Sequence, residues 1–150
     1  MTSKAAVEDF LNQRTLAIIG VSRDAKKFGN SIFRELTSQG YKLYPIHPEA
    51  KTLEGAPAHK DFASLPEKVD SAIIVVQPAK TEKVLQEAAA AGIRRVWMQQ
   101  GAESDAAVRF CQENGIAEIH GECLLMFVRG QAFPHSLHRF AWKLLGKYPA

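Results

Sequence analysis

The stretch that decides the fold runs from residue 15 to residue 30 and reads TLAIIGVSRDAKKFGN. Residues 15–19 carry no charge and no helical period, which predicts a strand that is buried on both faces. Gly20 follows directly, where the backbone must turn sharply. After a polar and basic loop, apolar residues recur at helical spacing, so a helix is predicted over 30–39.

A strand, a glycine turn and a helix in this order form a site for anions. The first N–H groups of the helix have no partner within it, and the positive end of the helix dipole points into the same crevice. We therefore expect a phosphate-bearing ligand at this turn. The residues expected to bind it are Gly20, Val21, Ser22, Arg23, Lys26, Lys27, Gly29 and Asn30.

Strand-like and helix-like segments alternate along the rest of the chain. Strands are predicted over 41–46, 71–76, 95–99 and 116–119, and helices over 3–12, 81–91 and 104–111, with Thr81 and Ser104 as N-caps. Residues 49–68 are expected to be irregular, with one helical turn at 61–65. The alternation predicts an α/β fold of Rossmann-like type, in which three α/β/α layers enclose a mainly parallel sheet of about five strands.

Length and composition are typical of one soluble globular domain. The chain has 150 residues, of which 46% are hydrophobic and 23% charged. We expect residues 1–150 to form one domain with a core at 15–127 and a basic extension at 128–150. The N-terminus lacks the apolar core of a signal peptide, and no apolar run reaches the roughly 20 residues of a membrane helix. A cytoplasmic location is therefore expected, with Cys111 and Cys123 reduced.

The basic character of the chain is local to its C-terminal part. The net charge is +3, yet residues 123–150 contain no acidic side chain and all of the excess positive charge. From Pro134 on, apolar residues at helical spacing predict an amphipathic helix, whose apolar stripe either covers the sheet or pairs with a second copy of the chain as a homodimer. Packing is the expected role of this helix, rather than contact with a membrane or with nucleic acid.

The carboxyl ends of parallel strands meet at one edge of a sheet, and ligands bind there. In this sequence the predicted strands all end in polar or turn-forming residues. The residues expected to line the edge beside the glycine turn are Ile46, His47, Pro48, Val76, Gln77, Pro78, Gln99, Gln100 and Gly101.

The turn lacks the two signals of a nicotinamide dinucleotide site. Gly20 is not followed by the Gly-x-Gly-x-x-Gly spacing, and the second strand ends in His47-Pro48 rather than in an acidic residue. The loop instead carries Arg23, Lys26 and Lys27, and Lys51 follows the second strand. Several cations at one turn favour a ligand with several phosphates, including one on the ribose. Coenzyme A fits this description, and NADP fits it less well.

At these residues the sequence resembles the coenzyme A-binding domain family, the stand-alone relatives of the N-terminal domain of the succinyl-CoA synthetase alpha subunit. The matching segments are AIIGVS at 17–22, YPIHP at 44–48, QP at 77–78, VWMQQG at 96–101 and ECLLM at 122–126. The resemblance implies that the backbone of 20–22 and the basic loop bind the phosphates. It also implies that 46–48 border the adenosine and that 76–78 border the pantetheine arm. The family often has Asn-Pro where this chain has His47-Pro48.

No catalytic constellation is evident in the sequence. The related synthetases phosphorylate a histidine in a separate domain, for which a chain of this length has no room. His120 with Cys123 and His135 with His138 make two loose pairs, which is too few converging ligands for a zinc site, so no metal is expected. We therefore expect a non-catalytic binding or carrier module for coenzyme A or an acyl-CoA. Two alternatives stay open: an NAD(P)-dependent oxidoreductase, and a regulatory or partner subunit of an enzyme that uses acyl-CoA.

Overall fold

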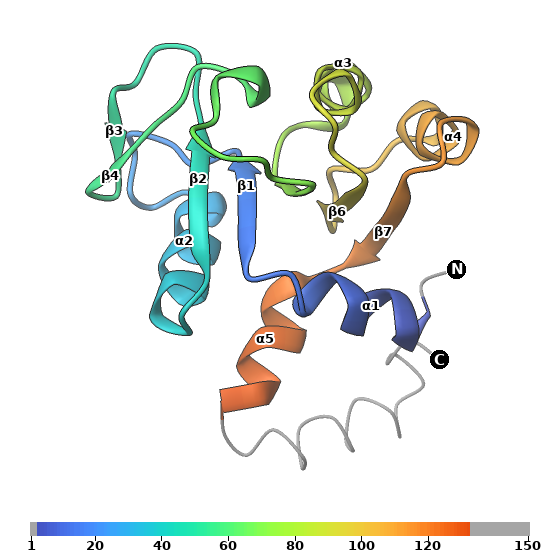
Figure 1. Ribbon diagram of the computed structural model, residues 1–150. Helices are drawn as coiled ribbons and strands as arrows, with labels where there is room; N and C mark the ends of the chain where they lie inside the picture. Colours follow the sequence, from blue (N-terminus) through green and yellow to red (C-terminus); the bar gives the residue numbers. More distant parts are fainter. Residues whose placement is uncertain (1–2, 133–150) are drawn as a thin grey trace.

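The computed structural model describes residues 3–132, with side chains described up to residue 128. Its central sheet has five parallel strands in the order β2-β1-β5-β6-β7 (Figure 1). The strands are β1 (Thr15–Ile19), β2 (Lys42–Ile46), β5 (Ser71–Ile74), β6 (Arg95–Gln99) and β7 (Ala117–Glu122). The helices are α1 (Lys4–Leu11), α2 (Phe28–Ser38), α3 (Pro78–Ala90), α4 (Asp105–Glu113) and α5 (Leu124–Ala132). The predicted α/β fold with a parallel sheet of about five strands is confirmed.

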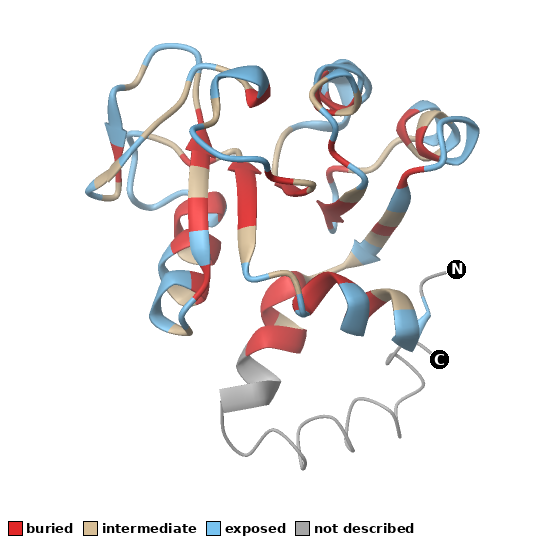
Figure 2. Cartoon of the chain, in the orientation of Figure 1, coloured by how far each residue is buried: buried red, intermediate tan, exposed pale blue. Residues whose placement is uncertain are grey.

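Helices cover both faces of the sheet and give the predicted three layers (Figure 1). Helices α1, α2 and α5 contribute to the apolar core on one face, and α3 and α4 to the core on the other. The central strands are buried on both sides, as their colour in Figure 2 shows. In β1, for example, Ile18 packs in the first core and Ala17 in the second, and both are fully buried. Because both faces of the sheet are covered, the central strands are runs of apolar residues without charges, rather than alternations of apolar and polar residues.

The connection from β2 to β5 contains more order than its sequence predicts. The expected single helical turn is present as η1 (Phe62–Ser64), but a hairpin of two-residue strands, β3 (Thr52–Leu53) and β4 (Ala56–Pro57), precedes it. His59 then pairs with the outer edge of β2. Its N–H donates to the Pro45 carbonyl at 2.9 Å, and its own carbonyl accepts from the His47 N–H at 2.8 Å. The connection thus covers an edge strand that would otherwise be open.

The prediction that Thr81 caps the third helix is wrong. Helix α3 begins three residues earlier, at Pro78, with Gln77 in the N-cap position. Proline fits the first turn because it lacks the N–H that would have no partner there. Thr81 is instead buried within the helix, where its hydroxyl donates to the Ala102 carbonyl at 2.6 Å. The residue therefore ties α3 to the loop that follows β6.

Helix α5 follows β7 directly and was not predicted. Leu124, Leu125 and Phe127 are buried in it, and the ring of Phe127 meets that of Trp97 edge to face, with centroids 5.4 Å apart. This helix completes the face that α1 and α2 cover. The amphipathic helix predicted from Pro134 on lies outside the described residues.

Candidate functional site

The first strand ends in a turn that has room for glycine alone. Gly20 has a φ of +118°, and a Cβ there would lie 2.1 Å from the carbonyl oxygen of Val75. A Cβ on Gly29, in the first turn of α2, would lie 2.2 Å from the carbonyl oxygen of Gly20. Two glycines nine positions apart therefore allow β1, α2 and the end of β5 to meet backbone to backbone. In a dinucleotide fingerprint, more closely spaced glycines serve the same close approach.

Asn30 holds the loop that connects β1 to α2. Its side chain is fully buried, and its Oδ1 accepts from the Ser22 N–H at 2.8 Å. Its Nδ2 donates to the Ser22 carbonyl at 2.8 Å and to Oε2 of Glu54 at 2.9 Å. Because Asn30 already uses the Ser22 backbone, the donors left for an anion are chiefly those of the first turn of α2. There, the Lys27 side chain forms no capping hydrogen bond.

Glu54 extends the hydrogen bonds of Asn30 to the β3–β4 hairpin. Besides Asn30, it contacts Arg34, whose Nη1 lies 3.1 Å from a Glu54 carboxylate oxygen and also donates to the Ala25 carbonyl at 3.2 Å. The hydrogen bond from Asn30, and then Arg34, hold the pKa of Glu54 below its ordinary value. The loop is thus positioned by side chains from α2 and from the hairpin.

The basic side chains of the loop are directed to solvent. Arg23, Lys26, Lys27 and Lys51 are all exposed. Arg23 lies 4.0 Å from Glu49, an exposed ion pair of little energetic weight. Arg23, Lys26 and Lys27 belong to the loop that precedes α2, where the positive end of the helix dipole adds to their field, and Lys51 directly precedes β3.

His47 follows β2 and accepts backbone hydrogen bonds from residues just after it, as an asparagine side chain would. Nδ1 of His47 accepts from the N–H groups of Glu49 at 3.1 Å and of Ala50 at 2.9 Å. These donors require an unprotonated Nδ1, so the neutral ring carries its proton on Nε2. An asparagine side-chain oxygen forms the same kind of turn two residues on. Beside it, Pro48 is exposed, whereas Ile46 is buried in the core.

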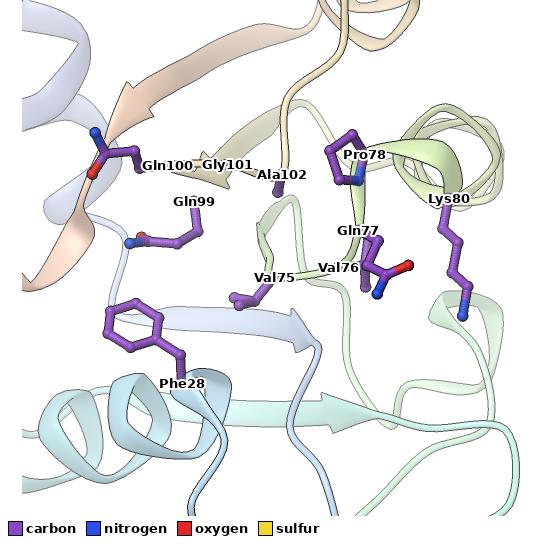
Figure 3. Close-up of a pocket in the computed structure, with 10 residues that line it drawn as sticks. All are labelled: Phe28, Val75, Val76, Gln77, Pro78, Lys80, Gln99, Gln100, Gly101 and Ala102. Carbon is purple, nitrogen blue, oxygen red and sulfur yellow. The ribbon is translucent and has the colours of Figure 1, made fainter.

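A cavity of about 580 Å³ opens at the carboxyl ends of β5 and β6 (Figure 3). It extends from the start of α2 to the start of α3. Its lining residues are Phe28, Val75, Val76, Gln77, Pro78, Lys80, Gln99, Gln100, Gly101 and Ala102. The volume lies within the range that is usual for small-molecule sites.

The structure brings together part of the predicted site. Val76, Gln77, Pro78, Gln99 and Gly101 all line the cavity. The residues of the glycine turn and those of 46–48 and Lys51 do not line it, but the turn adjoins it because Val75 contacts Gly20 and also lines the cavity.

Phe28 is the lining residue that sequence reasoning missed most clearly. The residue is 45% exposed, which makes it the one large hydrophobic residue that is exposed among the described residues. An apolar residue that follows two lysines just before Gly29 was the signal that could have identified it. Val75, Lys80 and Ala102 were also missed, because strand and helix patterns do not indicate which neighbours face a cavity.

The remaining candidate residues lie elsewhere. Nδ1 of His120 is 2.6 Å from Oε2 of Glu118 on β7. Cys111 is buried in α4, where burial raises the pKa of its thiol to about 12, so it is a poor nucleophile. Within residues 3–132, no three His, Cys, Asp or Glu side chains come together in a way that could hold a metal ion.

Comparison with known families identifies the family of the chain. The family model described as a CoA-binding domain matches residues 14–129, which is most of the chain and contains both the glycine turn and the cavity. The chain belongs to the CoA-binding domain family.

The relatives of the chain include much larger proteins. It is 38% identical over 88 residues to the alpha subunit of acetate–CoA ligase (ADP-forming) II from Pyrococcus furiosus. The match covers 58% of this chain and 19% of that subunit, so the chain spans about a fifth of the length of this relative.

Solved structures share the fold. A conserved hypothetical protein from Pyrococcus furiosus is 34% identical, with a TM-score of 0.71 and coverage of 75% of this chain and 97% of that one. The dinucleotide-forming acetyl-coenzyme A synthetase 1 of Candidatus Korarchaeum cryptofilum, in complex with phosphate and ADP, is 31% identical with a TM-score of 0.65. That match covers 73% of this chain and 26% of the synthetase.

None of the helices within residues 3–132 combines the length and the apolar character that crossing a membrane requires.

Proposed function

We propose that this chain binds coenzyme A or an acyl-CoA along the carboxyl edge of its sheet. Membership of the CoA-binding domain family supports the ligand. The observation that carries the proposal is the contact between Gly20 and Val75, because it joins the phosphate-type turn to the cavity of about 580 Å³. A ligand with an anionic end and a long, mostly neutral arm matches a basic turn that continues into a cavity lined mainly by uncharged side chains.

Each part of the coenzyme has a proposed position. The phosphates bind near the first turn of α2, where Gly20, Val21, Ser22, Gly29 and Asn30 shape the backbone and Arg23, Lys26 and Lys27 supply charge. The adenosine lies along Ile46, His47 and Pro48, with Lys51 near its ribose phosphate. The pantetheine arm enters the cavity along Val76, Gln77 and Pro78 and reaches Gln99 and Gly101.

The proposed role is binding or carriage of the coenzyme without chemistry of its own. A second role, as a partner of a separate enzyme that uses acyl-CoA, is favoured by one observation. The relative from Pyrococcus furiosus is a subunit of an acetate–CoA ligase, and this chain spans only 19% of that subunit. Purification of the chain from its native source under mild conditions tests this role, since a partner enzyme should elute with it.

Calorimetry on the whole chain tests the ligand. Coenzyme A, acetyl-CoA, NADP and NAD are titrated at one ionic strength, because phosphate contacts weaken as salt rises. We expect saturable binding of coenzyme A or acetyl-CoA, weaker binding of NADP and none of NAD. Tighter binding of a nicotinamide dinucleotide than of either coenzyme A species would overturn the proposal in favour of an oxidoreductase.

A further inference from the structure

Gln99, at the end of β6, is a polar residue buried in the wall of the cavity. The residue is 4% exposed, and in Figure 3 its side chain extends to the side of the cavity where the ring of Phe28 lies. A buried amide needs partners for both its oxygen and its nitrogen, since leaving either without one is destabilising. The hydrogen-bond partners of the Gln99 side chain therefore indicate which chemical group the cavity can bind.

The orientation of this amide is fixed by the chain itself. The N–H of Leu124, at the start of α5, lies 3.0 Å from the Gln99 side-chain oxygen. A backbone N–H can only donate, so the atom that faces it must be Oε1 and the NH₂ group must point away. Within residues 3–128, no side-chain or backbone acceptor is found for that NH₂ group. Among the described residues, this leaves the NH₂ group free to donate to whatever fills the cavity, whether water or a bound ligand.

The surroundings of Gln99 select the kind of acceptor. Val75, Val76, Ala102 and Phe28 line the same cavity with apolar surface. A neutral carbonyl oxygen beside this apolar surface needs only one donor, which the NH₂ group of Gln99 can supply. The cation among the lining residues, Lys80, is exposed at the start of α3.

We propose that the side-chain amide of Gln99 donates a hydrogen bond to a carbonyl oxygen at the acyl-pantetheine end of the ligand, an inference that rests on the proposed function. Coenzyme A offers two amide carbonyls along its arm, and an acyl-CoA adds a thioester carbonyl. All three present the same neutral acceptor. Gln99 thereby makes the cavity selective for a carbonyl-bearing arm over a purely apolar one.

Substitution of Gln99 by glutamate tests the donor with little change of shape. Gln99→Glu keeps an oxygen for the Leu124 N–H but replaces the NH₂ group by a second acceptor. Gln112→Glu on α4 is the control, because it makes the same change of charge on an exposed residue that does not line the cavity. Both variants and the wild type are titrated with coenzyme A and with acetyl-CoA. We expect Gln99→Glu to weaken binding at least tenfold and Gln112→Glu to change it less than twofold.

The comparison of the two ligands identifies the carbonyl. A loss for both ligands supports an amide carbonyl of the arm, and a loss for acetyl-CoA alone supports the thioester carbonyl. Unchanged affinity of Gln99→Glu for both ligands would overturn the inference and leave the proposed function intact. A wild type that binds neither ligand would overturn the proposed function and this inference with it.

A second measurement does not depend on whether the variant folds. The side-chain NH₂ signals of Gln99 in the wild type are followed by NMR as ligand is added. A new hydrogen bond should shift them, while the NH₂ signals of Gln112 stay in place. Gln99 signals that do not move at saturation would overturn the inference.

Discussion

The carbonyl oxygen of Val75 lies 2.1 Å from the position that a Cβ on Gly20 would occupy. No side chain fits at Gly20 unless β1 and the end of β5 move apart. The same contact connects the glycine turn to the cavity, so the stability of the turn and the binding site are expected to change together.

Gly20→Ala should therefore destabilise the chain strongly. The clash adds to the strain of a φ of +118°, and we expect a loss of about 3 kcal/mol in the free energy of unfolding. Gly92→Ala is the matched control, because Gly92 has a φ of +93° but nothing within 4 Å of the added Cβ. It should cost about 1 kcal/mol from strain alone. Urea unfolding measures both values, and equal losses would contradict the proposed packing.

His47 should tolerate asparagine better than alanine. Asparagine keeps an acceptor for the N–H groups of Glu49 and Ala50, whereas alanine leaves both without one. We expect His47→Ala to lower the free energy of unfolding by about 1 kcal/mol and His47→Asn to change it by less than about half of that. Thermal and urea unfolding provide the values. If His47→Asn lowers the free energy of unfolding as much as His47→Ala does, the hydrogen bonds accepted by Nδ1 do not stabilise the fold.

Glu54 should make stability depend on pH in the acid range. Its pKa is lowered in the folded chain, mainly by the hydrogen bond from Asn30, from an ordinary value of 4.5. A lowered pKa stabilises the fold above the unfolded value, and this contribution is lost as the pH falls through the folded value. The variant Glu54→Gln has no carboxylate at this position, so it lacks this pH-dependent contribution to stability. The difference in free energy of unfolding between wild type and variant should be constant from pH 7 to about 5 and shrink below pH 4.5.

Urea unfolding at several pH values measures that difference. A gap between wild type and Glu54→Gln that stays constant down to pH 3 would show that the carboxylate gains nothing from its partners.

Lys26 and Lys27 should contribute to coenzyme A binding through charge. We expect the double variant Lys26→Gln and Lys27→Gln to bind coenzyme A about tenfold more weakly and to depend less on salt. Lys83→Gln, on the exposed face of α3, is the control and should bind like the wild type. Calorimetry at low and moderate salt provides the comparison. Dephospho-coenzyme A should bind more weakly than coenzyme A to the wild type, and equal affinity would contradict a contact with the ribose phosphate.

The layers and strands of this fold were predictable because each central strand is a short apolar run with a turn signal at its end. Strand β1 was predicted with the bounds observed, and Ile18 shows why, since both faces of the sheet are covered. Strands β3 and β4 were not predictable, because two residues are too few to show any period. Thr81 was misplaced as a cap because a threonine before an apolar pattern has the same local sequence whether it caps a helix or is buried within it.

The glycine turn was predictable because it depends on local backbone, whereas the contacts around it depend on tertiary structure. The turn at Gly20 followed from the strand before it and the helix after it. The role of Asn30, in contrast, depends on Glu54, which is 24 residues away in sequence. The orientation of Gln99 likewise depends on Leu124 at the start of a helix that the pattern did not indicate.

Hydrogen exchange of the whole chain with and without coenzyme A tests the central claim most directly. If the coenzyme bridges the glycine turn and the cavity, amides in 20–30 and in 75–80 should both become slower to exchange on binding, while those of α4 stay unchanged. Binding that protects neither segment, or that protects a different face of the sheet, would contradict the account.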